Sequence, residues 1–260
     1  MAGGAETDPW LRFRAATRAR IGLGRSGDGL PTRALLDFQL AHARARDAVH
    51  GAVDVDRLAG DLAPHPTIRV HSAAPDRATY LRRPDLGRRL DAAGRVAASR
   101  AALPAGAWDI AFVIADGLSA AAVQAHAAAL VHACVDRLTS WSVAPVVLAV
   151  QARVALGDEV GALLGAKLVA LLVGERPGLS AADSLGVYLT WAPEPGCADS
   201  RRNCISNIHA AGLPIGAAAD KLCWLANEAA RLKLTGVALK EDAPALQDPA
   251  TAGPRPVERS

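Results

Sequence analysis

The sequence predicts an α/β protein in which a parallel-sheet domain follows a smaller helical domain. From Trp108 onward, short apolar runs alternate with helical segments, whereas the pattern before Ala102 is helical and shows no strand signal. The 260 residues are 51% hydrophobic but only 4% aromatic, which is typical of closely packed helices. A chain of this length can bury enough apolar surface to fold without disulfides or a structural metal. We therefore expect a helical domain over residues 10–102 and a sheet domain over residues 103–240.

The N-terminal half is rich in arginine and has a helical pattern. The stretch LPTRALLDFQLAHARARDAVH predicts a helix that starts at Pro31 and Thr32. One stripe along this helix consists of Leu36, Leu40, Ala43 and Asp47. Arginines also crowd GLGRSG and YLRRPDLGRRLD, where Pro and Gly break the segments. This pattern favours a solvated or partner-facing surface over a catalytic one.

Four strands are predicted in the second half, at WDIAFVIADG, APVVLAVQAR, KLVALLVGERPG and DSLGVYLTWAP. Ser119 is expected to cap the helix SAAAVQAHAAALVHACVDRL, GDEVGALLGA is a short helix, and PIGAAADKLCWLANEAARLKL ends near Gly236. Strands that alternate with helices pair in parallel through right-handed crossovers. The second domain is therefore expected to be Rossmann-like.

This architecture predicts where a ligand would bind. Ligands of open α/β sheets lie beyond the carboxyl ends of the strands, so four segments should converge there: Asp116 with Gly117, residues 151–154, residues 174–178 and residues 203–209. Glu175 follows an apolar strand directly, and its carboxylate can either accept hydrogen bonds from a ligand or pair with neighbouring side chains. The turn IADGLSA lacks the dinucleotide, P-loop and nucleophile-elbow patterns, which leaves a capped turn or an anion site.

Charge and cysteine usage exclude several classes of protein. The net charge of +3 is too small to indicate a nucleic-acid-binding protein. No apolar run is long enough for a membrane span and no secretory signal begins the chain, so we expect a cytoplasmic protein. The four cysteines form no C-x-x-C pair, which predicts free thiols and no metal site. Residues 1–9 and 241–260 are expected to be disordered.

Several stretches together resemble the small (light) subunit of ethanolamine ammonia-lyase, an adenosylcobalamin-dependent enzyme. They are ARIGLGRSGDGLPTRALLDFQLAHARARDAVH, DIAFVIADGLSAAAVQ, ARVALGDEVGALLGAKLVALLVGERPGLSAADSLGVYLT and RNCISNIHAAGLP, and the resemblance extends over about residues 10–239. It implies a cofactor held between this chain and a large TIM-barrel subunit that supplies the substrate pocket and the catalytic residues. It also implies six small and six large subunits and a radical conversion of ethanolamine to acetaldehyde and ammonia.

The resemblance further implies which residues contact the cofactor. In the family, the contacts from the small subunit fall on the valine of A-R-V-A, the glutamate of G-E-R-P-G and the cysteine of C-I-S-N-I-H. In this sequence these residues are Val154, Glu175 and Cys204, which lie in or beside the loops expected at the strand ends. The family is similar to base-on enzymes, in which cobalamin keeps its own dimethylbenzimidazole on cobalt.

The stretch NIHAAG raises one alternative, because it differs by a single residue from Asp-x-His-x-x-Gly. Through that signature, another class of cobalamin proteins offers a histidine to cobalt. Here Asn207 stands in place of the Asp that would hydrogen-bond the ligating histidine. We therefore interpret His209 as a loop residue near the cofactor rather than a metal ligand.

Two other functions compete with the subunit of a lyase. One is a non-catalytic cobalamin carrier, against which stand the Arg-rich helical half and the incomplete histidine signature. The other is a basic protein that binds nucleic acid, against which stand the low charge and the few aromatics. Family members enter bacterial microcompartments through an amphipathic N-terminal helix, and the residues before Trp10 show no clear helix of this kind.

Overall fold

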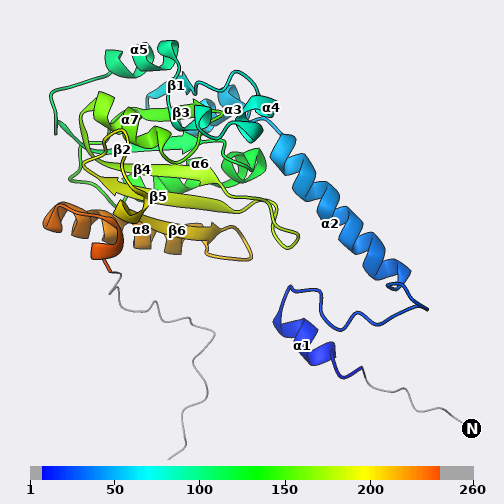
Figure 1. The fold of residues 1–260 in the computed structure, drawn as a ribbon. Coiled ribbons are helices and arrows are strands. Elements are labelled where there is room, and N and C mark those ends of the chain that lie inside the picture. Colours follow the sequence, from blue (N-terminus) through cyan, green and yellow to red (C-terminus); the bar gives the residue numbers. More distant parts are fainter. Residues whose placement is uncertain (1–7, 241–260) are drawn as a thin grey trace, which may run out of the picture.

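The computed structural model describes residues 8–240, and the expectations for the two chain ends lie outside this range apart from residues 8 and 9. Six strands form one sheet in the order β1-β3-β2-β4-β5-β6 (Figure 1). The strands are β1 (Thr67–His71), β2 (Trp108–Ala115), β3 (Val146–Val150), β4 (Ala166–Gly174), β5 (Leu185–Trp191) and β6 (Arg202–Ile208). The α-helices are α1 (Leu11–Ala16), α2 (Thr32–His50), α3 (Val55–Asp61), α4 (Arg77–Arg82), α5 (Ala92–Arg100), α6 (Ala120–Val135), α7 (Leu156–Leu164) and α8 (Ile215–Leu232).

The α/β class is confirmed, but the prediction of a parallel sheet is wrong because the sheet is mixed. β1, β3, β2 and β4 pair in parallel, whereas β5 pairs antiparallel with β4 and β6 pairs antiparallel with β5. A parallel crossover needs a dozen or more residues, usually including a helix. The link between β4 and β5 is only residues 175–184 and contains no helix, so the chain turns back on itself.

The two edge strands were not predicted from the sequence. β1 pairs with β3, which makes the expectation of a strand-free N-terminal half wrong, while a domain boundary near residue 102 stays a prediction. β6 was expected to be a loop and is a strand that pairs with β5. The sequences TIRVH and RNCISNI mix polar and apolar residues, so their pairing depends on neighbours in the sheet more than on their own periodicity.

Two apolar layers cover the sheet, and alternate residues of β2 face each layer. Ile110, Phe112 and Ile114 join the core formed with α6 and α8. Ala111 and Val113 join the core formed with α7 on the other face. Within residues 8–240, no helix has both the length and the apolar character needed to cross a membrane.

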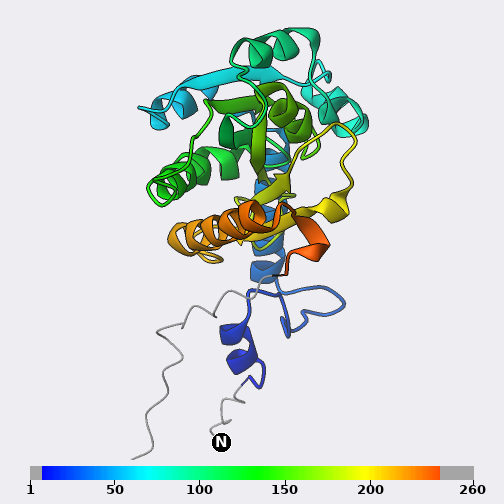
Figure 2. The same ribbon diagram turned by 90° about the vertical axis from the view of Figure 1, so that its left-hand side faces the viewer.

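The N-terminal arm, which we define as residues 8–50, extends away from these layers. In both ribbon views α2 leaves the body and α1 lies beyond its far end (Figures 1 and 2). The helix predicted after Pro31 is confirmed, but Ala48 is its only buried residue, whereas Leu36 is 57% exposed and Leu40 is 51% exposed. Other exposed large hydrophobics of the arm are Trp10, Leu11, Phe13, Leu30, Leu35 and Phe38.

A buried ion pair joins β6 to α7. The two guanidinium nitrogens of Arg202 donate to the two carboxylate oxygens of Asp158 at 2.5 and 2.8 Å. The same guanidinium donates to the hydroxyl of Thr190 and the carbonyl of Cys197. Both charged side chains are at most 2% exposed, so each charge depends on the other to offset the free-energy cost of its removal from water.

Candidate functional site

A cavity of about 440 Å³ lies at the carboxyl ends of the parallel strands and is open on one side. Three of the four predicted segments converge on it: the turn after β2, the loop after β3 and the end of β4. Val154 and Glu175 both line this cavity. Its other lining residues are Tyr80, Gly117, Leu118, Arg153, Val173, Gly174, Arg176 and Tyr188.

Asp116 positions the loop that carries Val154. Its carboxylate oxygens accept hydrogen bonds from the backbone N–H groups of Ala152 at 2.9 Å and Gln151 at 3.0 Å, and Arg77 lies 3.5 Å away. Burial raises the pKa of Asp116, while these backbone donors and Arg77 act in the opposite direction. The buried carboxylate is thus committed to shaping the β3–α7 loop.

Two glycines allow the turn after β2 to lie directly on the end of β4. Gly117 has a φ of 57°, and a Cβ there would overlap the carbonyl oxygen of Gly174. A Cβ on Gly174 would in turn overlap the carbonyl oxygen of Ser119. Leu118 N–H donates to Gly174 O at 2.9 Å. This wall of the cavity is therefore backbone packed on backbone.

Tyr80 lines the cavity from α4, in the half where no site residue was predicted. The guanidinium carbons of Arg77 and Arg153 lie 4.7 and 4.5 Å from its ring centre, and its hydroxyl donates to Ala152 O at 3.1 Å. Burial is the main cause that raises the pKa of Tyr80 to about 12, which keeps the phenol protonated. Arg153 Nε is buried and has no hydrogen-bond partner in the described part of the chain.

Glu175 begins the link between β4 and β5, and two donors hold its carboxylate. Ser184 Oγ donates to its Oε2 atom at 2.5 Å, and the backbone N–H of Asn207 donates to the same oxygen at 3.4 Å. No N–H or O–H group within residues 8–240 donates to Oε1. Glu175 therefore offers one occupied and one unoccupied carboxylate oxygen at the cavity.

Cys204 lies within β6 rather than at a strand end, opposite Tyr188 of β5. Because Tyr188 and Cys204 are directly opposite in an antiparallel pair, their side chains lie next to each other on one face of the sheet. Burial, with the neighbouring Cys204 and Glu175, raises the pKa of Tyr188 to about 12, and burial is also the main cause that raises the pKa of Cys204. Cys204 thus adjoins the cavity through Tyr188, as a protonated thiol.

His209 is buried in its own loop, and both of its ring nitrogens are engaged. Nε2 lies 2.8 Å from Asn207 Oδ1, and Nδ1 accepts from Ala211 N–H at 3.3 Å. Because Nδ1 accepts, Nε2 carries the proton in this arrangement. Among the residues that the structure describes, no group of three His, Cys, Asp or Glu side chains could hold a metal ion.

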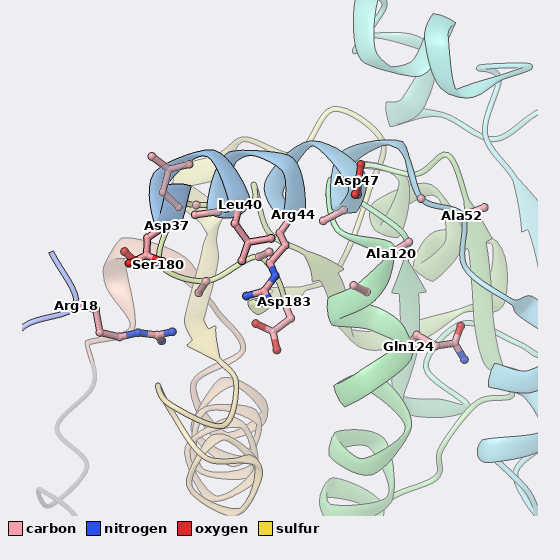
Figure 3. Close-up of a pocket in the computed structure, with 18 of the residues that line it drawn as sticks. Arg18, Asp37, Leu40, Arg44, Asp47, Ala52, Ala120, Gln124, Ser180 and Asp183 are labelled. Atoms are coloured by element: carbon pink, nitrogen blue, oxygen red, sulfur yellow. The ribbon is translucent and has the colours of Figure 1, made fainter. Parts of the chain in front are cut away.

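A second cavity, of about 980 Å³, lies elsewhere, between the N-terminal arm, the first turns of α6 and residues 178–183. Figure 3 shows Arg44 pointing from α2 toward Asp183 across this space, with Leu40 beside it. Its lining mixes both signs of charge with apolar side chains. The sequence did not predict this cavity, because it depends on where the arm leaves the body.

Comparisons with known proteins agree on one family. The model for "Ethanolamine ammonia-lyase light chain (EutC)" matches residues 7–240. Proteins named ethanolamine ammonia-lyase small subunit are similar to this chain. That of Bradyrhizobium diazoefficiens is 55% identical over 239 residues, covering 90% of this chain and 91% of the relative. That of Xanthomonas campestris pv. campestris is 54% identical over 242 residues, covering 91% and 89%. The chain therefore belongs to the ethanolamine ammonia-lyase small-subunit family.

Proposed function

We propose that this chain binds adenosylcobalamin together with a large subunit, and that the pair converts ethanolamine to acetaldehyde and ammonia. The observation that carries the proposal is the joint placement of Val154 and Glu175 on one cavity at the strand ends. These two residues also match the family's cofactor contacts by resemblance. Cys204 is the third proposed contact, and Tyr188 links it to the same cavity.

The groups around the cavity suit a corrin, which has apolar faces and a fringe of amide side chains. Val154 offers apolar contact, and Oε1 of Glu175 can accept a hydrogen bond from an amide. The buried Nε of Arg153 lacks an acceptor, which an oxygen of the ligand could supply. A cavity of about 440 Å³ that is open on one side holds only part of so large a ligand. The large subunit would cover the remainder.

The residues of this chain would bind and orient the cofactor and exclude water from it. When bound in its base-on form, adenosylcobalamin supplies the radical chemistry. With pKa values of about 12, Tyr80 and Tyr188 stay protonated near neutral pH and so add no charge to the cavity. No catalytic residue is assigned to this chain, and the catalytic groups are expected on the large subunit.

Activity from separate and mixed subunits tests the proposal. Acetaldehyde should form from ethanolamine and adenosylcobalamin only when this chain and its large subunit are both present. The native mass of the active complex would test the expected six small and six large subunits. If folded subunits form no acetaldehyde when mixed, the proposed activity is wrong. Tight cobalamin binding by this chain alone, without association, would support the carrier instead.

The N-terminal arm is the part of this chain that we propose to dock on the large subunit. Its exposed side chains include Leu35, Leu36, Phe38 and Leu40, an unusual concentration of large hydrophobics for a surface that stays in water. Arginines outnumber carboxylates over residues 8–50, which favours a partner surface that is apolar and acidic.

Replacing both Leu36 and Leu40 with Glu should weaken association with the large subunit at least about 10-fold, because it places charge in an apolar contact. The fold should remain intact, since both side chains are about half exposed, at 57% and 51%. Sedimentation of the mixed subunits measures the association. Val96→Glu is the matched control, because Val96 is 52% exposed on α5, outside the arm. Equal association of the double variant and the control would contradict docking through the arm.

A further inference from the structure

The carboxylate of Glu175 lies against bare backbone of β5. The three nearest atoms that a Cβ on Gly186 would meet all belong to Glu175, and the first is Oε1 at 2.9 Å. Ser184 Oγ donates to Oε2 at 2.5 Å, and Asn207 N–H donates to the same oxygen at 3.4 Å. The missing side chain of Gly186 therefore leaves room for the Oε1 side of the carboxylate, while the two donors hold Oε2.

The loop after β6 sets the direction of the Asn207 N–H group. Asn207 has a φ of 62°, in the left-handed region that glycine and asparagine adopt more readily than other residues. His209 donates to its side-chain oxygen at 2.8 Å, and Leu213 N–H donates to its carbonyl at 2.7 Å. A Cβ on Gly212 would overlap that carbonyl oxygen and would lie 2.6 Å from His209 Nε2. His209 and Gly212 thus stabilise the left-handed conformation of Asn207, whose N–H contacts Glu175.

We propose that Ser184, Gly186 and the loop of residues 207–212 form a clamp that fixes Glu175 and reserves its Oε1 atom for a donor on the cofactor. Ser184, Asn207 and His209 are positioning residues in this clamp. The inference rests on the proposed role of Glu175 in cofactor binding. It gives NIHAAG a function: its histidine holds Asn207, and its glycine leaves room for the turn.

A double-mutant cycle tests the clamp in the complex of this chain with its large subunit. The probe is hydroxocobalamin, and visible absorption reports its binding. Gly186→Ala should weaken binding about 10-fold, because the new methyl group displaces the carboxylate. In a Glu175→Ala background, Gly186→Ala should have no further effect, because the shorter side chain leaves that space free. This dependence isolates the contact between the two residues from any general loss of stability.

Ser184 provides a second, milder test. Ser184→Ala should weaken hydroxocobalamin binding about 3- to 10-fold, and Ser184→Thr should restore it to within about twofold because it keeps the hydroxyl. The control is Ser99→Ala, since Ser99 is exposed on α5 and should leave binding unchanged. Additive effects of Gly186→Ala and Glu175→Ala on binding would overturn the clamp but not the role of Glu175. Full affinity in both Gly186→Ala and Ser184→Ala, with weakened binding in Glu175→Ala, would lead to the same conclusion. Full affinity in Glu175→Ala would reject the proposed role of Glu175 and the clamp with it.

His209→Ala separates positioning from metal ligation. Binding should weaken about threefold, because Asn207 loses a hydrogen bond that holds its backbone conformation. Paramagnetic resonance of the cobalt(II) form should show the same axial nitrogen in the parent and in the variant. A protein imidazole signal that disappears in His209→Ala would make His209 a cobalt ligand and overturn its role as a positioning residue.

Discussion

Replacing Arg202 with methionine should destabilise the chain by about 3–5 kcal/mol, because it leaves the carboxylate of Asp158 buried without its partner. The Asp158 side chain is 1% exposed, so water cannot take the place of the lost guanidinium. The carbonyl of Cys197 and the hydroxyl of Thr190 also lose their donors. Urea unfolding of the full chain, followed by circular dichroism, measures the change in free energy.

Two further variants show whether burial is the cause of this loss. Arg231→Met should leave the free energy of unfolding nearly unchanged, because Arg231 is 64% exposed where it pairs with Glu228. Arg202→Met combined with Asp158→Leu should recover part of the loss, because no unpaired charge remains. If the double variant were less stable than Arg202→Met alone, the loss would not arise from an uncompensated carboxylate.

Gly174→Ala should cost about 3 kcal/mol and should also weaken cofactor binding, because a methyl group has no room at the end of β4. A Cβ there would overlap the carbonyl oxygen of Ser119 and would lie 2.7 Å from that of Asp116. Both neighbours are backbone atoms, so only a shift of the β2–α6 turn could relieve the overlap. Because this turn forms a wall of the cavity, hydroxocobalamin titration of the complex should report the shift together with thermal unfolding.

Gly216→Ala is the matched control for this substitution. Apart from its chain neighbours and the nearby backbone of its own helix, no atom lies within 4 Å of a Cβ built on Gly216, and the residue is exposed in α8. Alanine is favoured over glycine in helices by up to about 1 kcal/mol, so this variant should be as stable as the parent or more so. Equal unfolding free energies for Gly174→Ala and Gly216→Ala would contradict the close backbone packing at the end of β4.

The candidate site shows how far strand periodicity can predict a binding site. The carboxyl-end rule identified the segments containing Val154 and Glu175, and both residues line the cavity. It did not identify Tyr80, because α4 lies in the half of the chain for which no site was expected. It also did not identify Ser184, whose contact with Glu175 exists only because β4 and β5 form an antiparallel pair. The short, helix-free link between these strands was the signal that could have predicted that pairing.

The sequence by itself determined the four central strands, the long helices and the family of this protein. Apolar periodicity and capping by residues such as Ser119 are local properties, and the family motifs lie within continuous segments. Only the tertiary structure decided that β1 and β6 join the sheet, and that Asn207 N–H donates to Glu175. These features depend on contacts between residues far apart in the chain, and local periodicity carries no information about them.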